Sequence, residues 1–234
     1  MYGETREIKY SDLAPNGDAS LPAILRFYQD TAINHSAHAG YPLERLYGDD
    51  RAWILLSMNT DILRYPHYRE QVNVTTYTTA FERCFGYRAF EITDCEGNIL
   101  TTAASFWVFM DIKKGRPVRI YDDIPEKYGI EPKDTPEYIK REFETAEGAD
   151  ICDISVGKRD LDTNNHVNNV KLAEFLLEAM PIEAKIKKAQ IYYKHAAYEG
   201  EILTVSACTY GSETDVRLIG DNKIKTYARF EIKE

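Results

Sequence analysis

The first long periodic segment of the chain begins near residue 20 and has the spacing of one helix face. Apolar residues recur there at offsets of three, four, seven and eleven: Leu21, Ile24, Leu25, Tyr28 and Ala32. This spacing predicts an amphipathic helix. Ser20 is a favourable amino-terminal cap, Pro22 is tolerated in a first turn, and Gly40-Tyr41-Pro42 is expected to end the helix.

Strand-like segments follow the helix. Trp53–Met58 is apolar, and Val72–Tyr77 is rich in β-branched residues. Tyr87–Ile92 alternates between apolar and polar positions, Asp94–Asn98 has the composition of a hairpin turn, and Ile99–Asp111 is expected to return as a long strand.

A change of composition divides the chain after these strands. The stretch from 113 to 150 carries four prolines and many charges, and only Tyr138–Phe143 has a helical pattern. Such a stretch is typical of a connection that crosses the surface. We therefore predict a first domain at 1–125, a linker at 126–150 and a second domain at 151–234.

The second half repeats the order of the first. A polar stretch leads into a predicted helix with an apolar face, which Pro181 should stop: Val170, Ala173, Leu177 and Met180. Strands are expected at 188–196, 202–210, 215–219 and 223–232. The segment Leu63-Arg64-Tyr65 is similar to Ile191-Tyr192-Tyr193, 128 residues later, and Val72 to Ile202, 130 residues later.

A duplication of this kind predicts an α+β fold, with two units in which a curved antiparallel sheet wraps one helix. Chance similarity between two αβ segments is the alternative.

Composition narrows the function. The 234 residues carry a net charge of −9, which argues against nucleic acid as a partner and against an anionic membrane surface. The four cysteines lack metal-ligand spacing, the start lacks a signal-peptide layout, and the longest apolar run, Ala103–Met110, is too short to span a membrane. We expect a cytoplasmic protein with free thiols.

Most familiar catalytic motifs are missing, among them a nucleophile elbow, a phosphate loop and a dinucleotide fingerprint. His35 and His38 have a spacing compatible with metal ligation, but no carboxylate or cysteine nearby completes a set. A helix-surface position is favoured for both, and neither a metal nor an organic cofactor is expected.

The stretch 162–169 is the strongest candidate site. Asp162, Asn164 and His166 stand at alternate positions, which face one side in an extended segment. A helix cap is the simpler explanation, because Asn and Asp satisfy free backbone N–H groups. A cap needs one or two such residues, however, whereas this stretch holds five together with a histidine.

The nine residues Leu161-Asp162-Thr163-Asn164-Asn165-His166-Val167-Asn168-Asn169 resemble the L-D-x-N-x-H-V-N-N signature of acyl-acyl carrier protein thioesterases. Trp53–Met58 followed by Arg64-Tyr65-Pro66 is similar to the first-domain strand and turn of that family. The resemblance implies a tandem (double) hotdog fold. It also implies that fatty acyl-acyl carrier protein thioesters are hydrolysed to free fatty acid, ending fatty acid synthesis.

The resemblance assigns catalysis to Asp162, Asn164 and His166. As a hypothesis of mechanism, the imidazole of His166 acts as general base, and Asn164 positions the water or the thioester carbonyl. Asp162 would orient the imidazole or polarise water, and N–H groups near Val167 and Asn168 would hold the oxyanion. The family's usual glutamate aligns with Ala196. Whether His195, Glu199 or Glu201 replaces it, or nothing does, stays open.

The resemblance also implies that the first domain binds the acyl chain. Candidate contacts, each of which ordinary core packing would explain as well, are Trp53, Ile54, Leu56, Met58 and Trp107. The acidic carrier protein needs a local basic area, for which the densest run is Lys185, Lys187 and Lys188.

Three other functions remain open: hydrolysis of acyl-coenzyme A, a hotdog dehydratase, and a non-catalytic acyl-binding protein, which Ala196 would favour. A homodimer is possible.

Overall fold

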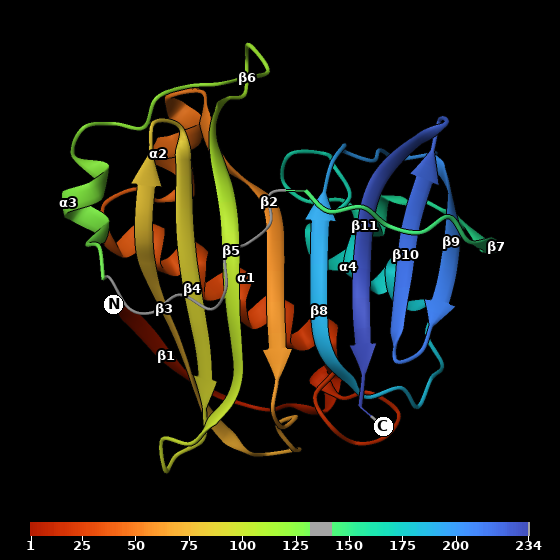
Figure 1. Cartoon of the computed structure of the whole chain (residues 1–234). Coiled ribbons are helices and arrows are strands. Elements are labelled where there is room, and N and C mark those ends of the chain that lie inside the picture. Colours follow the sequence, from red (N-terminus) through yellow and green to blue (C-terminus); the bar gives the residue numbers. More distant parts are fainter. Residues whose placement is uncertain (132–141, 234) are drawn as a thin grey trace. The chain divides into compact units, whose positions relative to one another are not determined.

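The computed structural model describes residues 1–131 and 142–233, and the chain forms two compact units, Met1–Ile139 (unit 1) and Lys140–Glu234 (unit 2) (Figure 1). The elements of unit 1 are β1 (Tyr2–Glu7), η1 (Tyr10–Asp12), α1 (Leu21–His38), α2 (Leu43–Gly48), β2 (Arg51–Ile62), β3 (Gln71–Glu82), β4 (Phe85–Thr93), β5 (Ile99–Asp111), β6 (Arg116–Pro117) and α3 (Ile124–Tyr128). Those of unit 2 are β7 (Ala149–Ser155), η2 (Lys158–Asp160), α4 (Asn169–Leu177), β8 (Ile186–Tyr193), β9 (Ile202–Tyr210), β10 (Glu213–Gly220) and β11 (Lys223–Ile232).

Unit 1 is an antiparallel sheet with strand order β1-β3-β4-β5-β2, and α1 runs across one face of it (Figure 1). The Ser20 side chain caps α1 by accepting a hydrogen bond from the N–H of Ala23, as predicted. The buried face of α1 meets the sheet where Tyr28 packs against Phe90 and hydrogen-bonds to Thr101.

Unit 2 repeats this arrangement with strand order β8-β11-β10-β9-β7 and helix α4. The predicted double hotdog, a helix in a curved sheet present twice, is confirmed. The helix itself differs from the prediction, because α4 ends at Leu177 and only turns follow it to Met180. Its buried side chains are Val170, Leu172, Ala173 and Leu176, so Leu177 and Met180 lie beside the packed face rather than on it.

The predicted connection at 126–150 contains the end of α3 and the start of β7. Of the predicted helix Tyr138–Phe143, residues 138–141 lie outside the described part of the chain, and Glu142 and Phe143 are not helical.

The duplication extends to individual backbone hydrogen bonds. In unit 1 the N–H of Ile8 donates to Glu70 O at 3.0 Å, and in unit 2 the N–H of Val156 donates to Glu201 O at 2.9 Å. Glu201 follows Glu70 by 131 residues. This offset of 131 corrects the two pairings made from sequence. Val72 was paired with Ile202, which is one residue too early in unit 2, and Leu63 was paired with Ile191, which is three residues too early.

Candidate active site

The segment from Leu161 to Val167 is a closed loop rather than the extended segment that we expected. Leu161 and Val167 form a β-bridge, and the N–H of Asp162 donates to His166 O at 2.7 Å. Asn165 closes the loop with a left-handed φ of 58°, a conformation that Asn tolerates better than most residues. The expected alternation nevertheless holds: Asp162, Asn164 and His166 are half-buried, while the residues between them are exposed.

The carboxylate of Asp162 holds the backbone of this loop. Its Oδ1 accepts hydrogen bonds from the N–H of Asn164 at 2.7 Å and from the N–H of His166 at 3.3 Å. Its Oδ2 lies 3.5 Å from Asn164 Nδ2. Asp162 and Asn164 are therefore brought together as expected, but the carboxylate contacts the main chain of His166 and not its ring.

The imidazole of His166 packs against a second segment, the turn 196–201. The ring centroids of His166 and Tyr198 are 5.0 Å apart with an interplanar angle of 89°, an edge-to-face arrangement. The N–H of Val167 donates to Ala197 O at 2.8 Å, so the loop and the turn are also joined through the main chain.

A buried ion pair fixes the turn. Lys225 Nζ lies 2.6 Å from Glu201 Oε2, and the two side chains are only 6% and 12% exposed. Lys225 also donates to Ala196 O at 3.2 Å, and Glu201 Oε1 accepts the N–H of Tyr198 at 3.1 Å. Glu201 is thus committed to the turn. His195 and Glu199, the other two candidates to replace the family glutamate, are exposed.

The start of α4 corrects one expectation. The N–H of Val167 is taken by Ala197 O, and the N–H of Asn168 donates to Asp160 O at 2.8 Å. Neither is available to an oxyanion. The side chain of Asn168 caps the helix by accepting the N–H of Val170 at 2.8 Å.

The five predicted acyl-chain residues do not all share one face of the unit 1 sheet. Trp53 lies opposite Phe109 and Met58 lies opposite Ser105, and directly opposed residues of an antiparallel pair project to the same side. Since 105, 107 and 109 alternate along β5, Trp53, Met58 and Trp107 share a face. Ile54 pairs with Val108 on the other face, and Leu56 sits at the register shift between Leu55 and Ser57.

A buried polar cluster on the helix-facing side of unit 1 was not expected. His35 is 3% exposed, which contradicts the predicted helix-surface position, and its Nδ1 accepts a hydrogen bond from Arg88 Nη1 at 2.7 Å. Arg88 also donates to Thr76 Oγ1 at 3.1 Å. Burial is the main cause that lowers the pKa of His35 to about 3, with the Arg88 charge adding to it. His38 is exposed, as predicted.

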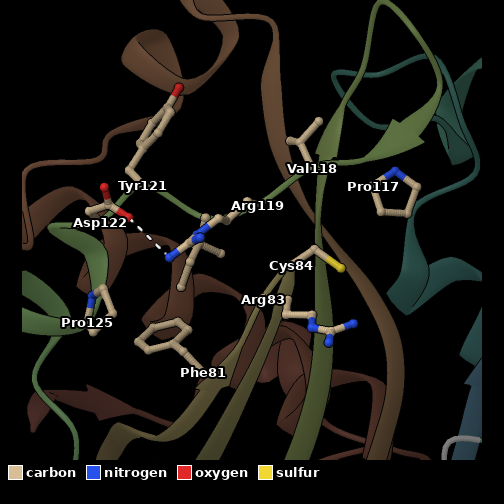
Figure 2. A pocket seen from close by; sticks show the side chains of 10 residues that line it. Phe81, Arg83, Cys84, Pro117, Val118, Arg119, Tyr121, Asp122 and Pro125 are labelled. Atoms are coloured by element: carbon tan, nitrogen blue, oxygen red, sulfur yellow. Dashed lines mark ion pairs between the residues drawn. The ribbon is translucent and has the colours of Figure 1, made fainter.

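Unit 1 also carries an open surface pocket of about 560 Å³ (Figure 2). Its walls come from the β3–β4 turn and the segment after β6, and its lining includes Phe81, Arg83 and Arg119, with the guanidinium group of Arg119 between Asp122 and Phe81 in the view of Figure 2. Arg119 is paired with Asp122 at 3.6 Å. No residue of the Leu161–Val167 loop lines this pocket.

Among residues 1–131 and 142–233, no group of three or more His, Cys, Asp and Glu side chains is arranged to hold a metal ion. Within those same residues, no helix has both the length and the apolar character needed to cross a membrane.

Comparisons with known proteins agree over both units. Residues 1–128 match the model of the acyl-ACP thioesterase N-terminal domain, and residues 143–229 match that of the acyl-ACP thioesterase C-terminal domain. A chloroplastic palmitoyl-acyl carrier protein thioesterase of Cuphea hookeriana is 30% identical over 199 residues, which cover 78% of this chain and 48% of that protein. The chain thus spans about half the length of this and similar curated relatives that it matches.

Two solved structures share the fold along the whole chain. An acyl-ACP thioesterase from Bacteroides thetaiotaomicron superposes with a TM-score of 0.88 at 19% identity, covering 99% of this chain and 97% of that one. A 12:0-ACP thioesterase from Umbellularia californica gives a TM-score of 0.88 at 21% identity, covering 99% and 96%.

Proposed function

The chain belongs to the acyl-ACP thioesterase family, and from this premise we propose that it hydrolyses fatty acyl-acyl carrier protein thioesters to free fatty acid and carrier protein. The observation that carries the proposal is the loop Leu161–Val167. It presents the half-buried side chains of Asp162, Asn164 and His166 on a backbone that hydrogen bonds hold at both ends.

In the proposed reaction His166 is the general base. Its imidazole removes a proton from water as the water oxygen attacks the thioester carbonyl carbon. The tetrahedral intermediate then collapses, the C–S bond breaks, and the proton passes from the imidazolium to the leaving thiolate. A thiolate leaves readily, so this second proton transfer is less demanding than in amide hydrolysis.

The other two residues divide the remaining work. The carboxamide of Asn164 is the donor that we assign to the carbonyl oxygen, because the N–H groups of Val167 and Asn168 are already bonded. Asp162 keeps the loop closed around Asn164 and His166 and adds a negative charge beside the imidazolium that forms.

In this proposal the division of labour follows the domains expected at 1–125 and 151–234. The first binds the acyl chain along the face shared by Trp53, Met58 and Trp107, and the second performs the chemistry. One methylene of fit is worth about 0.8 kcal/mol, so residue types do not define the preferred chain length.

The proposed partner is the acyl carrier protein that delivers the chain. There are two alternatives. The first is that coenzyme A carries the acyl chain, and the second is a non-catalytic acyl-binding protein, which the alanine at position 196 would support. The cytoplasmic location and a homodimer stay predictions; the Cuphea relative is chloroplastic.

One panel tests these proposals together. Fatty acyl chains of varied length and unsaturation, each linked to acyl carrier protein and to coenzyme A, are assayed for thiol release with the wild-type protein and with His166→Ala. We expect turnover on the carrier-linked series and a loss of about 10²- to 10⁴-fold in kcat for His166→Ala. Equal turnover by His166→Ala and the wild type would refute the assignment of His166 to the active site. Faster turnover of the coenzyme A thioesters would refute acyl carrier protein as the preferred carrier. Binding of the acyl chain without turnover would indicate a non-catalytic acyl-binding protein.

A further inference from the structure

A catalytic imidazole needs a neighbouring group that fixes the orientation of its ring. For His166, the residues at three positions, 162, 196 and 201, do not have a side chain available for this role. The Asp162 carboxylate is bonded to the backbone N–H groups of Asn164 and His166. Ala196, with which we align the family's glutamate, has a methyl group that forms no hydrogen bond. Glu201 is held by Lys225 and by the N–H of Tyr198.

The side chain in direct contact with the ring is Tyr198. Its ring meets the imidazole of His166 edge-to-face at 5.0 Å and 89°. Such aromatic pairs are favourable beyond the area they bury, enough to favour one ring orientation severalfold. Tyr198 is itself 48% exposed, so the contact with His166 accounts for its position better than core packing does.

Tyr198 has little freedom of its own at the main chain. Its N–H donates to Glu201 Oε1 at 3.1 Å, and its carbonyl oxygen accepts the N–H of Glu201 at 3.2 Å. Because Lys225 anchors Glu201 in a buried ion pair, the turn presents the phenol ring from a rigid base.

Unit 1 provides an independent comparison, because the corresponding loop, around residues 14–18, and the corresponding turn, around residues 66–67, are joined by the same backbone hydrogen bonds as in unit 2. The N–H of Ala14 donates to Asp18 O at 2.8 Å, and the N–H of Ala19 donates to Pro66 O at 2.8 Å, matching the bonds of Asp162 and Val167 in unit 2. Asp18 therefore stands where His166 does, and His67 stands where Tyr198 does. These two residues are also in direct contact, through a hydrogen bond of 2.8 Å between His67 Nδ1 and Asp18 Oδ1.

The same backbone arrangement therefore brings one loop residue against one turn residue in both units, His166 against Tyr198 in unit 2 and Asp18 against His67 in unit 1, with different chemistry in each. We propose that Tyr198 is a positioning residue that fixes the imidazole of His166 for catalysis, in place of the carboxylate missing at Ala196. This inference rests on the proposed function and assigns no proton transfer to Tyr198.

Three variants of Tyr198 separate the ring from its hydroxyl and from simple space filling. Tyr198→Phe keeps the aromatic edge-to-face contact, Tyr198→Leu fills the space without a ring, and Tyr198→Ala removes both. His67→Ala is the matched control, because it deletes the corresponding contact in unit 1.

We expect Tyr198→Phe and His67→Ala to stay within about twofold of the wild-type kcat. Tyr198→Leu and Tyr198→Ala should lower kcat about three- to tenfold while KM changes less than twofold, because a misplaced base affects the transition state rather than binding. Circular dichroism should show unchanged folding in all four, since the substituted side chains are exposed.

The second readout is the nuclear magnetic resonance signal of the His166 ring, assigned by its loss in His166→Gln. Removing the Tyr198 ring should shift the ring protons of His166, and the shift should be absent in Tyr198→Phe and His67→Ala. An unchanged His166 signal in Tyr198→Ala, wild-type kcat in that variant, or a loss of activity in Tyr198→Phe would each overturn the proposal. Because the signal does not require turnover, it remains decisive even if the protein hydrolyses no thioester.

Discussion

At the scale of single residues, the neutral His35 in unit 1 has a consequence for stability. Arg88 donates a hydrogen bond to its Nδ1, and burial holds its pKa at about 3. In the unfolded chain the pKa of a histidine is about 6.5. Between these two pH values the unfolded state binds a proton that the folded state does not, so folding stability must fall as the pH falls through this window.

We expect this group to contribute a slope of up to about 1.4 kcal/mol per pH unit to the free energy of unfolding between about pH 6 and pH 4. His35→Gln keeps an acceptor for Arg88 but does not titrate, so urea unfolding at a series of pH values should show a flatter dependence. His38→Gln, at an exposed site of the same helix, is the control and should keep the wild-type slope. Parallel curves for His35→Gln and the wild type would contradict this assignment.

At the scale of elements, unit 1 shows what the loop needs in order to fold. Ala14 occupies the place of Asp162, yet the loop closes with the same backbone bonds: Ala14 N–H to Asp18 O at 2.8 Å and Gly17 N–H to Ala14 O at 2.9 Å. In unit 1 the N–H of Asp18, the counterpart of His166, is accepted by Asn16 Oδ1 at 3.1 Å, so the loop closes with an amide acceptor in place of the carboxylate. We therefore expect the negative charge of Asp162 to matter more for the proposed catalysis than for folding.

Asp162→Ala should cost about 2 kcal/mol of stability, roughly 1 kcal/mol for each of the two backbone hydrogen bonds that its carboxylate accepts. Its kcat on carrier-linked thioesters should fall at least about tenfold, because the charge beside the forming imidazolium is lost. Thermal unfolding and steady-state kinetics measure the two effects separately. A variant with full activity would make Asp162 a turn residue alone, and a variant that does not fold would show that the comparison with Ala14 is misleading.

Whether a strand could be predicted from the sequence depended on whether its own apolar pattern defines it. Strands β5 and β9 have the predicted bounds, Ile99–Asp111 and Ile202–Tyr210, because their own apolar patterns define them. Strands β1 and β7 were missed. They are short edge strands, β1 alternates between half-buried and exposed residues and β7 is almost wholly exposed, so their pairing with β3 and β9 depends on the partner strand rather than on their own sequence.

The candidate site, whose catalytic role stays a prediction, could be located from the sequence only in its local part. Asp162, Asn164 and His166 stood out because they are close in sequence and too polar for a cap. The contact of His166 with Tyr198, the occupied N–H groups of Val167 and Asn168, and the burial of His35 against Arg88 all depend on tertiary partners. Arg88, for example, lies 53 residues from His35, and no local pattern signals such a pairing.

At the scale of the whole molecule, net charge opposes the proposed partner. A chain of net charge −9 repels an acidic carrier protein at long range, so productive docking depends on local cations at short range. Unit 2 offers Lys185, Lys187 and Lys188, each of which also has an interaction within the chain, as Lys187 does with Glu231 at 2.7 Å. Unit 1 offers Arg83 and Arg119, which line the pocket (Figure 2).

These two surfaces permit a test in which the change in net charge is held constant. Lys185→Glu with Lys188→Glu, and Arg83→Glu with Arg119→Glu, each make the protein more negative by the same four charges. If the lysines contact the carrier, the first pair should raise KM for carrier-linked thioesters about three- to tenfold at unchanged kcat, and the second should not. The difference should shrink at about 1 M salt, where the screening length falls to about 3 Å. Equal increases from both pairs would indicate a long-range effect of net charge, and an increase confined to the arginine pair would move the docking surface to unit 1.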